Sequence, residues 1–172
     1  MKFDTLFKYC PVCGSPDFSF NNFKSKRCLH CGFVMYVNPS AAVAAFVVNP
    51  RRELLVCVRA KDPVRGTLDL PGGFIDANET AEEAVMRELK EEIGLSTARP
   101  GYLFSLPNDY LYSGWNIPTL DLFYFVEVTD EFRPVAADDV ASCEFLPVQL
   151  IVPEKFGLSS IQRAVSMYLK MN

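Results

Sequence analysis

The sequence predicts an α+β domain preceded by a small cysteine-rich module. Apolar runs of strand length alternate with turn residues, two segments show the apolar periodicity of helices, and most of the cysteines lie near the N-terminus. Because strands and helices are mixed along one chain, we expect a sheet packed between helices. The cysteines of the N-terminal module indicate how a segment too short for a large core is held together.

The N-terminal module is defined by two cysteine pairs with the same spacing. Cys10 and Cys13 form the first pair, Cys28 and Cys31 form the second, and a glycine follows each pair. A two-residue spacer lets both sulfurs of a pair converge on one ion, so the pattern predicts four thiolates around a tetrahedral Zn²⁺. The predicted zinc ribbon covers residues 1–38.

Two other interpretations of these cysteines are weaker. Disulfides suit an oxidising compartment, but no apolar leader follows the initial methionine. A redox dithiol needs only one pair and leaves the second unexplained. Four sulfurs already complete a metal shell, so we expect His30 at the surface of the module. Cys57 and Cys143 lie in apolar runs and are expected to be buried thiols.

The larger domain is expected over residues 39–172, after a turn at "NPS". Apolar runs predict strands at residues 41–48, 54–60, 102–106, 120–128 and 143–148, with a closing amphipathic helix at 159–170. The ribbon alone is too small to bury its apolar segment "FVMYV", so we expect the two modules to pack together.

One helix, after "LDLPGG", has both ends marked in the sequence. Thr80 and Glu83 form the pattern of a capping box, and Gly94 is a typical C-terminal stop. Arg87 lies four residues from both Glu83 and Glu91, where it can pair with either. The segment 80–94 is therefore predicted to be helical.

This helix carries a dense group of carboxylates. Glu88, Glu91 and Glu92 fall within about a quarter turn at roughly 100° per residue. A solvated acidic stripe is the common meaning of such a run. However, like charges four residues apart repel and gain nothing unless a cation lies between them. A hard divalent cation, Mg²⁺ or Mn²⁺, prefers carboxylate oxygens and often bridges to phosphates, so a metal site is the sharper hypothesis.

The spacing around this helix resembles a known family. Gly73, Glu79 and the segment "RELKEEIGL" from Arg87 to Leu95 stand at the positions of the Nudix hydrolase signature. The resemblance extends from residue 39 to the C-terminus, and the cysteine pairs before it resemble those of NADH pyrophosphatases of the same family. It implies the family's fold, an α/β/α sandwich with a mixed sheet.

The resemblance also implies an activity. Nudix hydrolases of this kind cleave the diphosphate of a nucleoside diphosphate linked to another moiety, such as a nucleotide sugar, ADP-ribose or a dinucleotide. They use divalent metal ions held by the motif. The metal ligands implied here are Gly73 (through its carbonyl), Glu79, Glu88, Glu91 and Glu92, and the implied catalytic residues are Arg87, Glu88, Glu91 and Glu92. Which glutamate is the base stays open.

The segment "SLPNDYLYSGW", residues 105–115, stands where NADH pyrophosphatases carry a specificity motif. Its first and third residues match that motif and the next three depart from it, so NADH pyrophosphatase is the alternative rather than the main hypothesis. Aromatic side chains here are candidates for stacking on a nucleobase, and an arginine before the helix is a candidate for a phosphate contact. The substrate-binding candidates are Arg59, Tyr110, Tyr112 and Trp115.

Charge and hydropathy limit the partners. The formal net charge of −4 at pH 7 does not favour a polyanion, and no run approaches the ~20 apolar residues of a membrane span. We predict a cytoplasmic protein with a small-molecule substrate and no membrane contact, with nucleic acid unfavoured and a homodimer as one assembly to test. The alternatives of another class are a non-catalytic nucleotide sensor and a nucleic-acid-binding ribbon, which has a basic patch at "KSKR".

Overall fold

A computed structural model describes residues 7–112 and 114–171. Their contacts divide into two compact units. The first contains the described residues up to Pro39 together with Asp109–Pro118, and the second contains Ser40–Asn108 and the described residues from Thr119 onward. The sequence did not predict that segment 109–118 would group with the N-terminal residues.

The first unit is built on a three-stranded antiparallel sheet of β1 (Phe18–Asn22), β2 (Ser25–Cys28) and β3 (Val34–Tyr36). Two similar turns precede β1 and follow β2. In each turn, the glycine after the second cysteine has a positive φ, 72° at Gly14 and 79° at Gly32. The N–H of each glycine donates to the carbonyl of the first cysteine of its pair. Glycine adopts this conformation without steric cost, which explains its place after each pair.

The second unit is a mixed sheet with the order β10-β5-β4-β9-β8, on which β6 pairs with β5 and β7 with β4. β4 and β9 are parallel, whereas β4 is antiparallel to β5 and β7. The strands are β4 (Ser40–Val48), β5 (Glu53–Arg59), β6 (Leu68–Asp69), β7 (Gly72–Phe74), β8 (Gly101–Tyr112), β9 (Trp115–Glu127) and β10 (Val140–Pro147).

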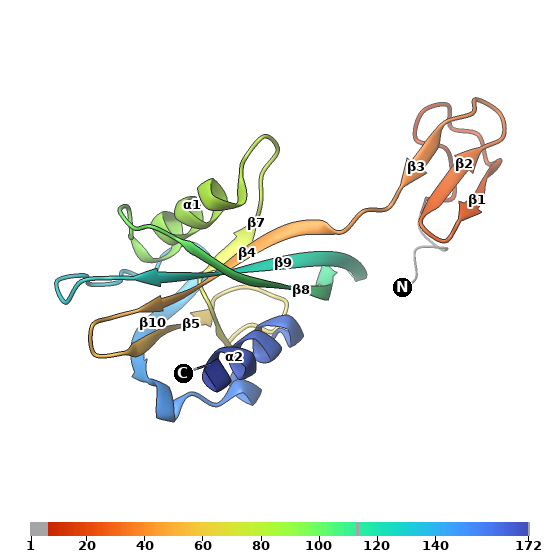
Figure 1. Ribbon diagram of the computed structural model, residues 1–172. Helices are drawn as coiled ribbons and strands as arrows, with labels where there is room; N and C mark the ends of the chain where they lie inside the picture. Colours follow the sequence, from red (N-terminus) through yellow and green to blue (C-terminus); the bar gives the residue numbers. More distant parts are fainter. Residues whose placement is uncertain (1–6, 113, 172) are drawn as a thin grey trace. The chain divides into compact units, whose positions relative to one another are not determined.

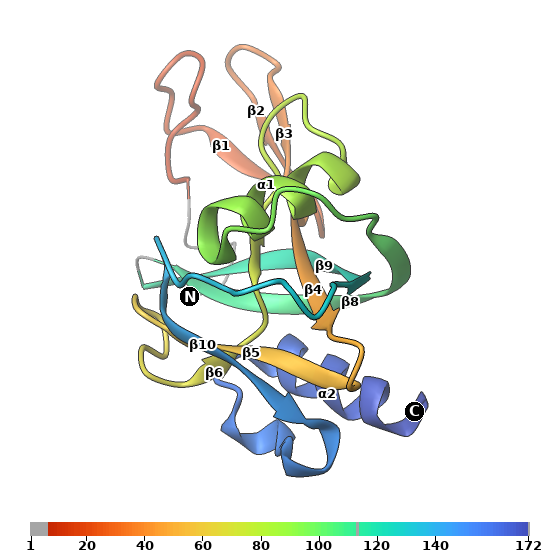
Figure 2. The same ribbon diagram turned by 90° about the vertical axis from the view of Figure 1, so that its left-hand side faces the viewer.

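The helices α1 (Ala81–Ile93) and α2 (Ser159–Met171) cover opposite faces of this sheet, as both views show (Figure 1, Figure 2). Two short 3-10 turns, Val148–Leu150 and Pro153–Lys155, lead from β10 to α2. The predicted sheet between helices is confirmed. None of the helices in the described part of the chain is long and apolar enough to cross a membrane.

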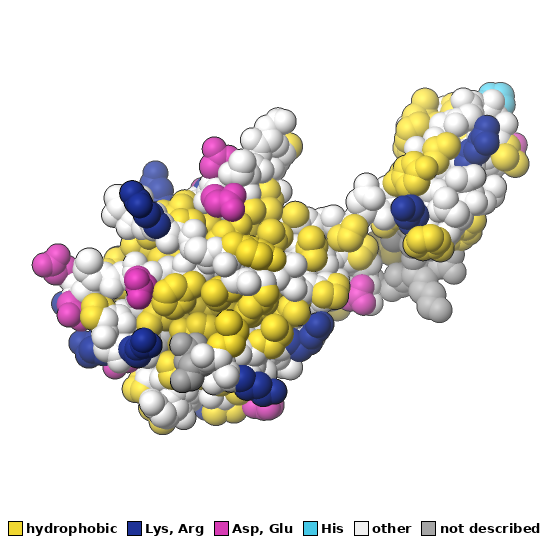
Figure 3. Space-filling view, in the orientation of Figure 1, with side chains coloured by type: hydrophobic (Ala, Val, Ile, Leu, Met, Phe, Trp, Pro, Cys, Tyr) yellow, Lys and Arg dark blue, Asp and Glu magenta, His cyan; other side chains and the backbone are white. Residues whose placement is uncertain are grey.

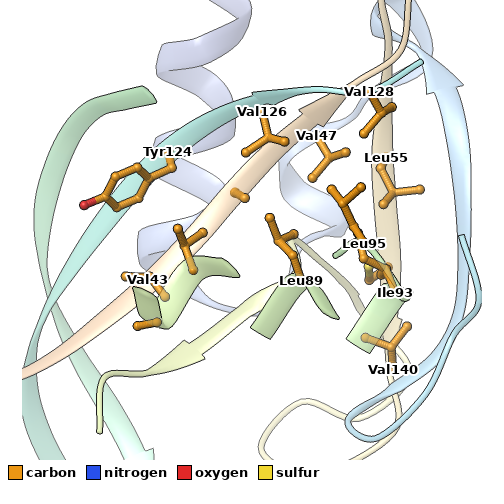
Figure 4. Close-up of a cluster of buried hydrophobic side chains, with 14 residues drawn as sticks. Val43, Val47, Leu55, Leu89, Ile93, Leu95, Tyr124, Val126, Val128 and Val140 are labelled. Carbon is orange, nitrogen blue, oxygen red and sulfur yellow. The ribbon is translucent and has the colours of Figure 1, made fainter. Parts of the chain in front are cut away.

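The central strand β4 is apolar from Ala41 onward, and from Val43 to Val48 both of its faces are buried. Val43 and Val47 point toward α1, where they pack with Leu89 and Ile93 (Figure 4). Phe46 points the other way, toward α2, and its ring stacks on that of Tyr168 with centroids 4.3 Å apart. α1 is thereby held against the sheet by its apolar face, which sets the position of its acidic face.

β8 and β9 are longer than the sequence predicts, and together they form a hairpin. Residues 105–112, which include Pro107, lie in β8, and Trp115 begins β9. β8 is at the end of the strand order, and an edge strand tolerates proline because it need not donate on its open side.

Candidate metal and active site

The four N-terminal cysteines come together in the first unit. Their Sγ atoms all lie within 4.8 Å of one another, and the Cys10–Cys31 and Cys13–Cys28 pairs are each 3.6 Å apart. All of the cysteines are free thiols. A tetrahedral site with metal–sulfur bonds of about 2.3 Å has sulfurs about 3.8 Å apart, so this donor set fits one ion.

The backbone lowers the pKa of one thiol of this cluster, Cys28, whereas burial and the neighbouring sulfurs raise the pKa of Cys13 and of Cys31. The N–H of Cys31 points to Cys28 Sγ at 3.5 Å, and this backbone contact is the main reason that the pKa of Cys28 falls to about 6. His30 is exposed, as expected. Among the described residues, the buried members of this unit's core cluster are Cys10, Phe18 and Cys28, so the sulfurs are themselves a large part of its core.

In the second unit, the ends of α1 are as predicted. Thr80 and Glu83 form a reciprocal capping box, and Gly94 ends the helix with φ 74°. Glu83 is occupied by this cap, because its Oε2 accepts from both the N–H and the hydroxyl of Thr80. The predicted alternative pairing of Arg87 with Glu83 is therefore wrong, and Arg87 turns toward other carboxylates.

Two α1 carboxylates converge on strand β7. Glu92 is only 5% exposed, and its Oε2 accepts a hydrogen bond of 2.8 Å from the N–H of Gly72. The Glu88 carboxylate lies against Gly73, where an added Cβ would be 2.3 Å from Oε1. The glycines therefore let the strand approach both glutamates. The sequence predicted that they share one helix face, but not that both carboxylates lie against this strand.

Arg87 donates hydrogen bonds to three carboxylates of the motif. Its guanidinium donates to Glu79 at 2.8 and 3.0 Å, to Glu88 at 2.8 Å, to Glu91 at 3.2 Å and to the Phe74 carbonyl at 2.9 Å. Hydrogen bonding from Arg87 is also the main reason that the pKa of Glu79 is lowered. Arg87 thus links the loop after β7 to the acidic face of α1.

Burial disfavours the charged forms of two of these carboxylates. Desolvation raises the pKa of Glu92 to about 8 and also raises that of Glu88. Glu92 has a neutral donor in Gly72, and no ion pair of Glu92 is found among the described residues. A buried carboxylate without a counter-charge is costly, and a hard divalent cation would remove that cost. The residues therefore fit a metal site.

Two further carboxylates, which the sequence analysis missed, lie close to this group. The loop that contains Asp138 and Asp139 is hydrogen-bonded to the end of α1. The N–H of Ala137 donates to the Glu92 carbonyl at 2.9 Å. The charge of Asp138 contributes to raising the pKa of Glu88, and that of Asp139 contributes at Glu92. The only sequence signal was a pair of adjacent acids in a loop, which is weak.

The predicted substrate-binding residues are divided between the two units. Arg59 is largely buried, pairs with Asp69 and donates to the Pro63 carbonyl at 2.9 Å, so its guanidinium serves the fold. Tyr110, Tyr112 and Trp115 belong to segment 109–118, which groups with the first unit, whereas the glutamates belong to the second. A substrate contact by any of these four residues stays a prediction.

Comparison with known proteins identifies the fold and its motif. The family model of the NUDIX domain matches residues 38–166. The chain belongs to the NUDIX domain family. Its structure is similar to that of a NUDIX hydrolase from Nitrosomonas europaea, with a TM-score of 0.73 and 21% identity, covering 95% of this chain and 91% of that one.

Two curated relatives of this NUDIX protein differ in how much they cover. An ADP-ribose pyrophosphatase of Methanocaldococcus jannaschii is 44% identical over 61 residues, which are 36% of each chain. The NAD-capped RNA hydrolase NudC of Pseudomonas aeruginosa is 24% identical over 164 residues, 94% of this chain and 55% of the relative. The chain therefore matches only about a third to a half of the length of these relatives.

Proposed function

We propose that this NUDIX protein is a metal-dependent hydrolase that cleaves the diphosphate of a nucleoside diphosphate linked to another moiety. The observation that carries the proposal is the convergence of the buried Glu92 and the partly buried Glu88 on the glycine strand β7. Burial disfavours the charged form of both carboxylates and raises the pKa of each, although Glu88 is paired with Arg87. This cost is explained if the site holds cations that bind substrate phosphates.

Each residue of the motif has a role in this proposal. Glu88 and Glu92 are the chief ligands of Mg²⁺ or Mn²⁺, with Glu91, Glu79 and the Gly73 carbonyl as further ligands. When bound, the cation neutralises phosphate oxygens and lowers the pKa of the attacking water. Arg87 is a positioning residue, because its hydrogen bonds hold Glu79, Glu88 and Glu91 in one arrangement. A glutamate of the group accepts the proton of the water.

The cysteine cluster is proposed to bind Zn²⁺ with a structural role. Four sulfurs close the coordination shell and leave no position for water or substrate. The proposed location is the cytoplasm, where thiols stay reduced and are available to a metal. Catalysis is assigned to the carboxylates of the second unit alone.

The proposed substrates are of the ADP-ribose and dinucleotide type. The names of the two relatives support this class, since one is an ADP-ribose pyrophosphatase and the other acts on NAD-capped RNA. Both substrates contain a nucleoside diphosphate linked to a second group. The relative that matches 94% of this chain is the one that acts on NAD-capped RNA. A dinucleotide attached to the end of an RNA is therefore a second proposed substrate of the same class.

A panel of compounds tests the proposal. The zinc-loaded chain is incubated with ADP-ribose, NADH, dinucleotides and nucleotide sugars in Mg²⁺ or Mn²⁺, and the products are treated with phosphatase to release phosphate. We expect metal-dependent release from at least one of these compounds and no release without the divalent ion. Tight binding of a nucleotide without any cleavage would instead identify a sensor.

Gly73→Ala is expected to separate activity from stability. The new Cβ would meet the end of the flexible Glu88 side chain, which can move away at little cost in folding. Moving a metal ligand by about 1 Å is expected to lower kcat/KM roughly a hundredfold. The measurements are kcat/KM and the melting temperature in the absence of metal.

The neighbouring glycine provides the matched control. A Cβ at Gly72 would lie 2.1 Å from the Val43 carbonyl oxygen and 2.7 Å from the Cα of Ala44, and the φ of 152° is unfavourable for alanine. Gly72→Ala must displace the backbone of β4 and is expected to lower the melting temperature strongly. If Gly73→Ala keeps full activity, the Glu88 carboxylate does not need its position beside β7.

A further inference from the structure

The charge of the chain is unevenly distributed between its parts. Residues 7–39 contain four basic side chains and one acidic one, a net charge of +3, in a chain of net charge −4, so the remainder carries −7. A Zn²⁺ with four thiolates adds −2 and leaves this segment positive. The overall negative charge, which argued against a polyanionic partner, therefore conceals a basic module. On the face of this module shown in Figure 3, basic side chains lie among apolar ones.

Only two of the three cations in the predicted basic patch are exposed in the structure. Lys26 is only 5% exposed, its Nζ donates to the Phe7 carbonyl at 2.7 Å, and it lies over the Phe18 and Phe20 rings at 5.1 and 5.6 Å. This lysine holds the ribbon together. Lys24 and Arg27 are the exposed cations of the patch.

Exposed cations and aromatic side chains lie in the β1–β2 turn and on one face of β2 and β3. Arg27 faces Val34 across the sheet, and Tyr36 is two residues further along β3, so Arg27 and Tyr36 share one face. Tyr36 is 53% exposed. The Val37 N–H donates to the Lys24 carbonyl at 2.9 Å, which brings the β1–β2 turn beside the end of β3. We call Phe23, Lys24, Arg27 and Tyr36 the ribbon strip.

Phe23 is the most exposed large hydrophobic residue among those described, at 90%. It lies at the tip of the β1–β2 turn, with the Lys24 ammonium 5.8 Å from its ring centroid. Phe23 therefore contributes little to the packing of the ribbon itself. An exposed aromatic ring beside a cation is what nucleic-acid proteins use to stack a base and pair its phosphate.

We propose that the ribbon strip binds single-stranded RNA, stacking bases on Phe23 and Tyr36 and pairing phosphates with Lys24 and Arg27. A single strand offers base faces that a duplex conceals. The net positive charge of residues 7–39 favours the phosphate backbone of RNA over a neutral or basic protein surface. The RNA would be the body of a substrate whose end is cleaved by the glutamate site, and this last step rests on the proposed function.

Binding is tested without catalysis. Fluorescence anisotropy of a labelled, unstructured RNA 12-mer is measured with the full-length zinc-loaded chain and no added Mg²⁺ or Mn²⁺. Phe23→Ala is expected to weaken binding roughly five- to hundredfold, the range of one lost base stack. Arg27→Gln is expected to reduce the slope of log affinity against log salt by about 0.7, the value of one phosphate contact on a single strand.

Matched variants control these measurements. Lys155→Gln removes the same charge from an exposed site in the second unit and is expected to leave affinity and salt slope unchanged. Leu150→Ala removes another exposed apolar side chain, 63% exposed, with the same expectation. Zinc content of each variant confirms that the ribbon is folded. Wild-type affinity in both Phe23→Ala and Arg27→Gln overturns the proposal, and so does equal affinity for duplex RNA.

The other occupant of this surface is a second copy of the chain. Analytical ultracentrifugation of wild type and Phe23→Ala decides this point. Loss of a dimer in the variant, with RNA affinity unchanged, would identify a self-association surface and overturn the proposal. A wild-type sedimentation profile in a variant that has lost RNA affinity supports it.

Turnover separates this inference from the proposed function. An RNA with a dinucleotide end is compared with the free dinucleotide. Phe23→Ala is expected to lower kcat/KM for the RNA relative to the free compound by the factor measured in anisotropy, whereas Lys155→Gln keeps the wild-type ratio. If the wild type cleaves neither compound, the proposed function fails, and the anisotropy data still decide the RNA surface.

Discussion

Glu92→Gln and Glu88→Gln are each expected to lower turnover of a nucleoside diphosphate substrate roughly a thousandfold or more. Loss of a metal ligand costs several kcal/mol of transition-state stabilisation, and about 1.4 kcal/mol corresponds to each factor of ten. The variants keep the shape of the side chain and its contact with β7. The measurement is kcat/KM across a Mg²⁺ titration.

The same substitutions are expected to stabilise the metal-free protein. Burial raises the pKa of Glu92 from its ordinary value of 4.5 to about 8 in the folded chain. The folded state therefore binds a proton more tightly than the unfolded state, and stability is lost as pH rises from about 4.5 to about 8. The melting temperature of the metal-free wild type should fall across this window. It should fall less in Glu92→Gln, and Mg²⁺ should restore it in the wild type.

Glu127→Gln is the matched control, since it makes the same chemical change at an exposed strand end. It should leave turnover unchanged and should not alter the pH dependence of melting. A solvated acidic stripe makes a different prediction for Glu88 and Glu92. Wild-type rates in both variants, without a metal-dependent rise in the wild-type melting temperature, would show that these glutamates do not bind the catalytic metal.

Cys28→Ser is expected to unfold the ribbon while the NUDIX domain stays folded. The core cluster of the ribbon contains few buried residues besides its sulfurs, and structural zinc contributes on the order of 10 kcal/mol or more to folding in small modules. Metal analysis should find about one zinc per chain in the wild type and much less in the variant. Hydrogen exchange should show loss of protection in β1, β2 and β3 alone.

Cys143→Ser controls for the loss of a thiol outside the cluster, and it should keep zinc and ribbon protection. Cys28→Ser should keep much of its turnover of a free nucleotide substrate even though its ribbon is unfolded, because the proposed chemistry lies at the glutamates. Finding zinc with a water molecule as its fourth ligand would contradict a purely structural role. Ribbon protection that survives in Cys28→Ser would show that the metal is not needed for folding.

The local features of this protein were predictable because they depend on short spacings. The capping box of Thr80 and Glu83, the stop at Gly94 and the shared helix face of Glu88 and Glu92 follow from helix geometry. The clustering of the four cysteines follows from the geometry of a two-residue spacer. In each case the interacting groups are within a few residues, or one metal imposes the arrangement.

The contacts that complete the site depend on residues far apart in the chain. The approach of Asp138 to the glutamates depends on how the loop before β10 docks on α1, and no local pattern encodes this. The burial of Arg59 with Asp69 depends on the pairing of β5 with β6. An arginine near a phosphate site and an arginine in a buried pair look alike in a sequence.

The sequence by itself determined which residues carry chemistry: the cysteine pairs, the glutamates of α1 and the glycines before them. The tertiary structure alone decided how much water each group keeps, and therefore its electrostatics. Glu92 is a buried acid with a raised pKa only because β7 and α1 meet at Gly72, and Lys26 is withdrawn from the basic patch only because the ribbon folds around it. The physical reason is that desolvation is a property of all surrounding elements, whereas helix phase and ligand spacing are properties of a single segment.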